Sequence, residues 1–149
     1  MAPLGGARRE GSMITAALDP GIEYAVAIGE DGRFVAVYYQ PPLPFPFRVD
    51  RFVVEFPKYY PGGAPPSSLI ELGFSAGIQC GLMGVQNAKN VARVNTVSIP
   101  KSIVEKRVRK ILTPPELVAL ERGIAEVPNS YRNNCYDAVR HLLVDCGRF

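Results

Sequence analysis

The stretch Met13-Ile14-Thr15-Ala16-Ala17-Leu18-Asp19-Pro20-Gly21-Ile22 decides how the fold begins. Its apolar part, residues 13–18, predicts a strand whose C-terminal tip carries Asp19. Pro20 and Gly21 then predict a turn into a second strand, because proline presets φ and glycine tolerates positive φ. A carboxylate at the end of a buried strand costs several kcal/mol unless a partner compensates its charge. A metal ion is one such partner, and a simple turn-initiating role for Asp19 is the alternative.

Two further acids occur in comparable settings. The segment Phe52-Val53-Val54-Glu55-Phe56-Pro57 predicts a short apolar strand that ends on Glu55 and is stopped by proline. Asp137 lies three positions after Asn134, so both side chains share one face of a helix expected from about 133 to 146. A favourable helix start, with asparagine as cap and an acid in the first turn, is the alternative for this pair. Gathered at one sheet edge, these oxygens would suit Mg²⁺ or Mn²⁺ rather than zinc.

Composition bounds the class of protein. The chain has 149 residues, of which 47% are hydrophobic and 21% charged, and this fits one folded domain. No apolar run reaches the roughly 18–20 residues of a membrane span. Residues 1–12 predict a disordered leader ahead of a domain at 13–149. The three cysteines form no CxxC pair, which favours reduced thiols over a disulfide framework or a zinc site.

Turn signals divide the first half of the chain into strands. Asp31-Gly32 joins apolar runs at 24–28 and 33–39 and predicts a hairpin. The first three strands therefore form an antiparallel meander. Four prolines between residues 40 and 50 exclude a helix from that segment.

The second half predicts helices. Capping-box patterns, in which a hydroxyl residue precedes a glutamate by three positions, begin at Ser68, Ser102 and Thr113. The last is followed by proline at the first helical position. The expected helices span about 68–86, 102–112 and 114–124, with a fifth strand at 93–99. This order indicates an α/β fold with a mixed five-stranded sheet flanked by helices.

Positive charge is concentrated between residues 88 and 110. The net charge is only +3, yet Glu105 is the one acid in this segment. The bases are Lys89, Arg93, Lys101, Lys106, Arg107, Arg109 and Lys110. Such a block predicts a contact surface for a phosphate backbone, and a solvated helix face is the alternative.

The stretch from Ile14 to about Val144 resembles the RuvC-type Holliday junction resolvases, particularly their small phage-like members, within the RNase H-like superfamily. The resemblance rests on four pieces in order and spacing. They are Leu18-Asp19-Pro20-Gly21, Val53-Val54-Glu55-Phe56-Pro57, Asn134-x-x-Asp137-Ala138, and Ile99-Pro100-Lys101 followed by Arg107 and Leu112-Thr113-Pro114-Pro115-Glu116. It implies an RNase H-like nuclease that resolves four-way DNA junctions by phosphodiester hydrolysis with two divalent ions, Mg²⁺ or Mn²⁺. It also implies a homodimer and a cytoplasmic location in a prokaryotic cell, in a host or phage-encoded form.

The resemblance assigns roles to particular residues. Asp19 resembles the first-strand carboxylate that bridges the metals, Glu55 the fourth-strand glutamate, and Asp137 the final-helix aspartate. Asn134 stands where the family has aspartate or histidine; its amide oxygen can coordinate a metal but adds no charge. Lys101 would stabilise the reacting phosphate or contact the scissile strand, with an ordinary exposed lysine as the alternative. The DNA contacts implied are Phe56, Lys58, Tyr59, Tyr60, Lys89, Arg93, Lys106, Arg107 and Lys110.

Within that set, Tyr59 or Tyr60 would stack on an exposed base at the branch point, or pack against the neighbouring prolines instead. The chain departs from the family at 40–50, where a helix is often present. Here Leu43, Phe45 and Phe47, or a partner subunit, would shield the sheet. Asp145 is not expected to replace a metal ligand, because eight helical residues from Asp137 span roughly 12 Å.

Two features stay open at this stage. Gly73, Ala76, Gly77, Gly81 and Gly84 in the 68–86 helix indicate a close backbone approach, either to the sheet or to a twin helix in a partner. His141 follows Asp137 by one helical turn, and we expect a surface or packing role for it rather than one beside the metals.

Other functions would use the same residues. A nuclease acting on flaps or forks is one, and a junction-binding protein that has lost cleavage is another, which Asn134 permits. An actin-like or sugar-kinase ATPase is disfavoured, because Ile22-Glu23 follows the glycine where that class needs a hydroxyl. Such an ATPase also needs two lobes, and the length allows one.

Overall fold

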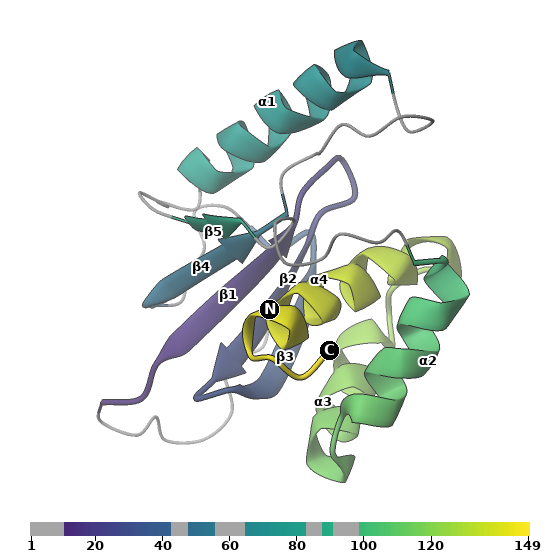
Figure 1. The fold of residues 1–149 in the computed structure, drawn as a ribbon. Helices are drawn as coiled ribbons and strands as arrows, with labels where there is room; N and C mark the ends of the chain where they lie inside the picture. Colours follow the sequence, from purple (N-terminus) through teal and green to yellow (C-terminus); the bar gives the residue numbers. More distant parts are fainter. Residues whose placement is uncertain (1–10, 43–47, 56–64, 83–87, 91–98) are drawn as a thin grey trace.

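The computed structural model describes residues 11–42, 48–55, 65–82, 88–90 and 99–149 (Figure 1). The chain forms an α/β fold in which helices flank a mixed β-sheet. Its four longer strands are β1 (Ile14–Asp19), β2 (Ala25–Glu30), β3 (Arg33–Tyr39) and β4 (Arg51–Val54). The three-residue strand β5 (Ala88–Asn90) extends the sheet, so that the strand order is β3-β2-β1-β4-β5.

The predicted meander is confirmed. Strand β1 pairs with β2, and β2 with β3, in antiparallel orientation, whereas β4 is parallel to β1. The β2–β3 turn has positive φ at both Asp31 and Gly32, 50° and 81°, as the Asp-Gly hairpin signal requires. The backbone N–H of Asp31 also donates to the Met13 carbonyl at 3.1 Å, which closes the turn against the start of β1.

The helices begin where proline allows rather than where the serine patterns predict. They are α1 (Pro66–Leu82), α2 (Lys101–Ile111), α3 (Pro114–Ile124) and α4 (Arg132–Asp145), with a 3₁₀ turn η2 (Asn129–Tyr131). The starts predicted at Ser68 and Ser102 are therefore wrong. Pro66 is the first residue of α1, where the fixed φ of proline fits a helix, and Pro100 is the N-cap residue directly before α2.

The Thr113 capping box is confirmed. The Glu116 carboxylate accepts hydrogen bonds from both the backbone N–H and the hydroxyl of Thr113, each at 2.9 Å. The predicted fifth strand at 93–99 is not confirmed. Residues 91–98 lie outside the described part of the chain, and the observed β5 comes earlier. The leader residues 1–10 and the shielding residues Leu43, Phe45 and Phe47 also lie outside the described residues.

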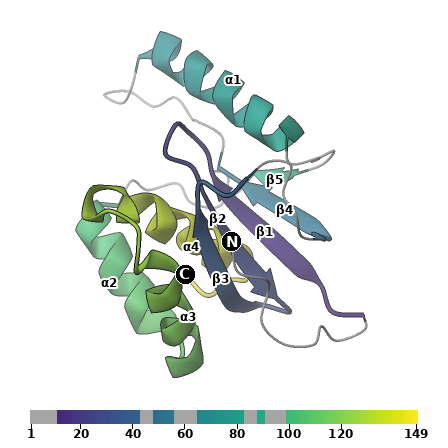
Figure 2. The ribbon, with the colours of Figure 1, turned by 180° about the vertical axis from the view of Figure 1, so that it is seen from behind.

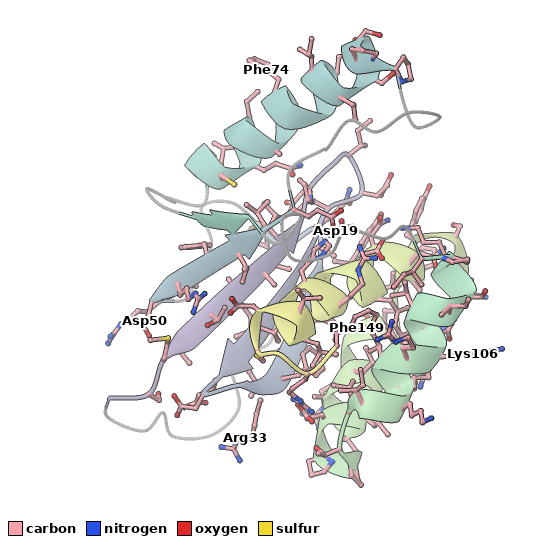
Figure 3. The ribbon with its side chains drawn as sticks, viewed as in Figure 1. Asp19, Arg33, Asp50, Phe74, Lys106 and Phe149 are labelled. Carbon is pink, nitrogen blue, oxygen red and sulfur yellow. The ribbon has the colours of Figure 1, made fainter. Side chains whose placement is uncertain are left out.

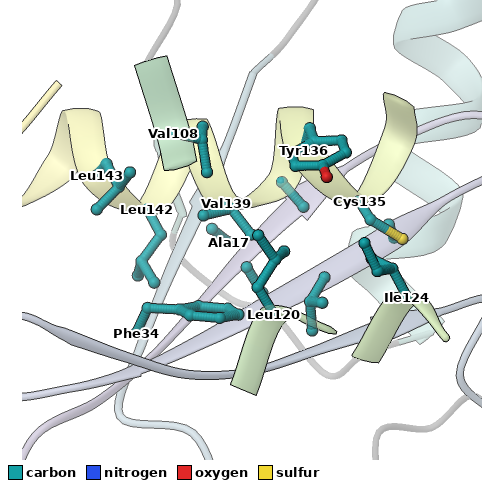
Figure 4. Packing of buried hydrophobic residues seen from close by; sticks show 14 of the residues in the cluster. Ala17, Phe34, Val108, Leu120, Ile124, Cys135, Tyr136, Val139, Leu142 and Leu143 are labelled. Atoms are coloured by element: carbon teal, nitrogen blue, oxygen red, sulfur yellow. The ribbon is translucent and has the colours of Figure 1, made fainter. Parts of the chain in front are cut away.

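Helices α2, α3 and α4 cover one face of the sheet (Figures 1 and 2). Helix α4 lies directly on the strands, and its Cys135, Val139 and Leu142 pack with Phe34 and Leu120 in the larger core cluster (Figure 4). The opposite face carries a second cluster formed by Ile14, Ala16, Leu18, Val26, Ile28 and Val54. Successive residues of β1 therefore point to opposite faces, as strand geometry requires.

An ion pair between the partly buried Arg148 and the buried Glu116 joins the C-terminus to this core. The Arg148 guanidinium donates to both carboxylate oxygens of Glu116 at 2.7 Å, and the backbone N–H of Phe34 donates to the same group at 2.8 Å. Burial alone would raise the pKa of Glu116, but the hydrogen bonds from Arg148, Thr113 and Phe34 lower it to about 2. Glu116 thus ties α3, β3 and the C-terminal residues together.

Helix α1 stands apart from α2, α3 and α4 in both views (Figures 1 and 2). Its Gln79 side chain pairs with the Gly21 backbone, accepting from the Gly21 N–H at 3.0 Å and donating to the Gly21 carbonyl. Ala76 is buried, and Cys80 packs against the second core cluster. All three cysteines are free thiols, as predicted. No helix in the described ranges has the length and apolar character needed to cross a bilayer.

Candidate active site

Strand register brings the first two acids together. In the parallel β1–β4 pair, Ala17 lies opposite Val53 and Leu18 opposite Val54. One residue farther along each chain are Asp19, the last residue of β1, and Glu55, which directly follows β4. Because side chains alternate, both acids belong to the face that carries Ala17 and Val53, beneath α4. The two strand ends predicted to carry carboxylates are therefore neighbours.

Helix α4 supplies the third acid from above the same sheet edge. Asp137 and His141 are one turn apart and both are buried. Figure 3 shows Asp19 at the end of the sheet beside α4. We call Asp19, Glu55 and Asp137 the acid cluster. Its members come from three elements far apart in the sequence, and they lie close together in the fold.

His141 links two members of the acid cluster. Its Nδ1 lies 3.3 Å from Oε2 of Glu55, and its Nε2 lies 3.6 Å from Oδ1 of Asp19. A surface role for His141 is wrong, because the imidazole is buried, and it lies between two candidate ligands. Its spacing of four residues from Asp137 is the signal that places it on the same helical face.

Two basic side chains complete the site. Nη2 of Arg140 lies 3.1 Å from Oε2 of Glu55 and 3.9 Å from Oδ1 of Asp137, so it bridges the second and third acids. The Lys101 ammonium forms an ion pair with Oδ2 of Asp137. Lys101 is thus at the site, as predicted, and it is not an ordinary isolated surface lysine. Arg140 was not predicted; its spacing of three residues from Asp137 is the sequence signal that places both on one helical face.

The electrostatics reflect this crowding. Burial raises the pKa of Asp19, and the nearby Asp137 carboxylate adds to the effect, while His141 and Lys101 act in the opposite direction. Burial, reinforced by Asp19, also raises the pKa of the Cys135 thiol to about 12. The Cys135 thiol is therefore neutral at pH 7 and a poor nucleophile.

The donor set fits a hard divalent cation in chemical type. The three carboxylates and the His141 imidazole lie near one another, and a bound cation would offset the cost of desolvating the Asp19 carboxylate. In the described ranges, however, no three His, Cys, Asp or Glu side chains already converge as a metal-binding group. The carboxylates are oriented toward Arg140, His141 and Lys101 instead. Asn134 is half-buried one turn before Asp137, and its role as a ligand stays a prediction.

The predicted DNA contacts divide into two groups. Lys106, Arg107 and Lys110 lie exposed on α2, with Lys106 pointing away from the fold (Figure 3). The guanidinium of Arg107 lies 4.0 Å from the Phe149 ring centroid. Phe56, Lys58, Tyr59, Tyr60 and Arg93 lie outside the described residues, as does the side chain of Lys89.

Asp145 is at the far end of α4 from the acid cluster. Its carboxylate pairs with Arg51 at 2.7 Å, at the start of β4, whereas Glu55 follows the end of that strand. This confirms that Asp145 does not join the candidate ligands.

Comparisons with known proteins identify no relative. No protein-family model, no curated protein and no solved structure matches the chain.

Proposed function

We propose that this chain is a metal-dependent, structure-selective endodeoxyribonuclease with an RNase H-like fold that resolves four-way DNA junctions. One observation carries the proposal, namely the convergence of Asp19, Glu55 and Asp137 from β1, β4 and α4 at one edge of the sheet. Carboxylates in this number serve phosphodiester hydrolysis, because they hold Mg²⁺ or Mn²⁺ against a negatively charged substrate. The proposal includes a cytoplasmic location in a prokaryotic cell, with the protein encoded either by the host or by a phage.

The residues of the site have separable tasks. Asp19, Glu55 and Asp137, with Asn134, would hold two ions, which when bound activate water and neutralise charge on the leaving oxygen. Arg140 holds Glu55 and Asp137 in place through its guanidinium. The Lys101 side chain is 59% exposed, so its ammonium can leave Asp137 and contact a phosphate oxygen.

Helix α2 supports a path for the DNA strand. It begins with Lys101 at the acid cluster and continues to Lys106, Arg107 and Lys110, which are exposed. Arg109 is engaged with Glu121 and with the Tyr136 hydroxyl, so it contributes to the fold instead. A DNA phosphate backbone lying along α2 would contact these basic side chains. The affinity for DNA would therefore fall steeply as the salt concentration rises.

Helix α1 supports a homodimer. Its side chains at four-residue spacing, Ile70, Phe74, Ile78 and Leu82, are exposed, with Phe74 at 71%. Among the described residues, no atom lies within 4 Å of a Cβ atom added at Gly77 or Gly81. This open space favours a twin helix over the sheet as the partner of these glycines. A four-way junction has near two-fold symmetry, and a symmetric dimer would present one site to each strand.

A second candidate function is a junction-binding protein without cleavage. Lys101 and Arg140 already neutralise Asp137 and Glu55, and Asn134 adds no negative charge for a second ion. Such a protein would keep the basic face of α2 and would bind junctions in the presence of a chelator. Cleavage of flaps or forks is a variant of the first function and uses the same residues.

The test is a cleavage assay on synthetic substrates. A four-way junction, a flap, a fork and a linear duplex are incubated with wild type, Asp19→Asn, Glu55→Gln and the control Asp145→Asn, in Mg²⁺, Mn²⁺ or EDTA. We expect paired cuts in the four-way junction with either metal, none in EDTA, and cleavage by the control close to wild type. Both site variants should bind the junction without cutting it. Equal cleavage by the two site variants and wild type would refute the assignment, and binding without cleavage by wild type would favour the second candidate.

A further inference from the structure

His141 carries a buried polar atom that the fold leaves without a hydrogen bond. The residue is 1% exposed, and its Nε2 has no hydrogen-bond partner among the described residues. An unsatisfied buried polar group costs free energy and calls for an explanation, such as a bound ion. Nε2 faces Asp19 within the acid cluster, so the explanation lies at the candidate active site.

The two ring nitrogens have different surroundings. Nδ1 lies 3.3 Å from Oε2 of Glu55, and a proton on Nδ1 would be held by that carboxylate. The Nε2 lone pair then faces Oδ1 of Asp19 at 3.6 Å, which is too long for a direct hydrogen bond. A lone pair facing a carboxylate in a buried site is favourable when a cation lies between them. Carboxylate, imidazole and metal in this order form a common arrangement around protein metal ions.

We infer that Nε2 of His141 is a nitrogen ligand, together with Asp19, for a divalent ion of the proposed nuclease, and that it makes the site prefer Mn²⁺ to Mg²⁺. The inference rests on the proposed function, because it names a ligand of the same cation site. An all-oxygen site suits Mg²⁺, whereas imidazole binds transition metals such as Mn²⁺ more favourably. The nitrogen donor adds a ligand to the site, although, like Asn134, it adds no negative charge.

The sequence makes a direct test available. His141 is the one histidine of the chain. Pulsed electron paramagnetic resonance detects nitrogen nuclei that are coupled to bound Mn²⁺. In the untagged protein, any histidine nitrogen detected in this way therefore belongs to His141. We expect wild type to show ¹⁴N imidazole modulation, and His141→Gln to lose it. In calorimetric titrations, His141→Gln should weaken Mn²⁺ binding about 10–100-fold and Mg²⁺ binding much less.

The outcomes separate this inference from the proposed function. Mn²⁺ that binds wild type without ¹⁴N modulation, or an unchanged Mn²⁺/Mg²⁺ affinity ratio in a folded His141→Gln variant, would overturn the nitrogen ligand. Cleavage that still depends on Asp19 would leave the nuclease standing in that case. Absence of Mn²⁺ binding together with absence of metal-dependent cleavage would overturn both. Because the spectrum is recorded on wild type, a misfolded variant does not leave the inference untested.

Discussion

Helices α4 and α1 are both rich in apolar residues, yet the fold uses them in opposite ways. Helix α4 buries Cys135 through Val139 and His141 through Leu143 against the sheet. Helix α1 leaves Phe74 and Ile78 in solvent and is tied to the β1–β2 turn by the amide of Gln79. The apolar content of a helix therefore does not by itself determine whether the helix is buried. Helix α4 positions the candidate site inside one chain, whereas the exposed apolar side chains of α1 are those that we propose for a contact between chains.

Two helical glycines show the same contrast at atomic scale. A Cβ at Gly123 of α3 would lie 2.5 Å from Cγ1 and 2.7 Å from the backbone oxygen of Val37, so the glycine permits close packing on β3. A Cβ at Gly77 of α1 would meet no atom of the described residues within 4 Å. Gly123 is therefore needed for packing within the chain, whereas the described residues show no such need for Gly77.

The largest expected effect separates the two ends of α4. Asp137 and Asp145 are equally buried, with side chains 6% exposed, and each forms an ion pair. We expect Asp137→Asn to lower junction cleavage by about 10²–10³-fold, because it removes a member of the acid cluster. Asp145→Asn should leave cleavage per folded molecule within about twofold of wild type. Single-turnover kinetics would measure both, and equal losses would contradict the placement of the site.

The next effect concerns the ion pair that holds α3 and the C-terminus on the sheet. Glu116→Gln should lower the free energy of unfolding by about 3 kcal/mol at pH 7, since it breaks a buried pair. The folded-state pKa of Glu116 is about 2, below the ordinary 4.5. Its contribution is therefore full above about pH 4.5 and is lost as the pH falls toward 2.

Urea unfolding at pH 7 and at pH 3 measures this contribution. The difference in the free energy of unfolding between wild type and Glu116→Gln should be smaller at pH 3 than at pH 7. Glu121→Gln is the control on the same helix. Its side chain is 57% exposed in the pair with Arg109, so the expected loss is under about 1 kcal/mol. An equal loss in both variants would show that burial of Glu116 does not set its contribution.

A smaller effect comes from the two glycines. Gly123→Ala should destabilise the fold by about 1–3 kcal/mol, because the backbone of Val37 cannot move away cheaply. Gly77→Ala should stabilise the monomer by up to about 1 kcal/mol through helix propensity. Chemical unfolding at low protein concentration compares the two. Destabilisation by Gly77→Ala under those conditions would indicate a contact within the chain.

The smallest effect on stability is expected on the exposed face of α1. Phe74→Ser combined with Ile78→Ser should convert a dimer to a monomer, while the monomer's free energy of unfolding changes by less than about 0.5 kcal/mol per site. Val118→Ser is the control, because Val118 is also exposed but lies on α3. Sedimentation over a range of concentrations measures the association. A wild type that stays monomeric would contradict the assignment of α1 to an interface.

Local signals predicted the parts of the fold that local chemistry determines. The Asp31-Gly32 turn and the apolar runs around it predicted the meander, and the Thr113 capping box predicted α3 to the residue. The serine patterns mispredict the starts of α1 and α2. Helix α1 begins at Pro66 and α2 directly after Pro100, in each case before the predicted serine. The site was partly predictable, since its three acids mark the ends of strands or a helix face.

The rest of the site depends on tertiary packing. Arg140 and His141 reach the acid cluster because α4 crosses the sheet above Asp19 and Glu55, and the crossing is set by the core beneath it. No local pattern specifies which face of α4 meets the strands at that point. The exposure of α1 is also a tertiary property, because its glycines fit either a sheet or a partner helix.

The central claim is that acids from β1 and α4 act as one catalytic unit. The most direct measurement compares junction cleavage by Asp19→Asn, Asp137→Asn and the double variant. Burial raises the pKa of Asp19, so a neutral asparagine there should not lower the melting temperature. Each single variant should lose about 10²–10³-fold, and the double variant scarcely more than either. Losses that multiply, or singles that cleave like wild type, would contradict the claim.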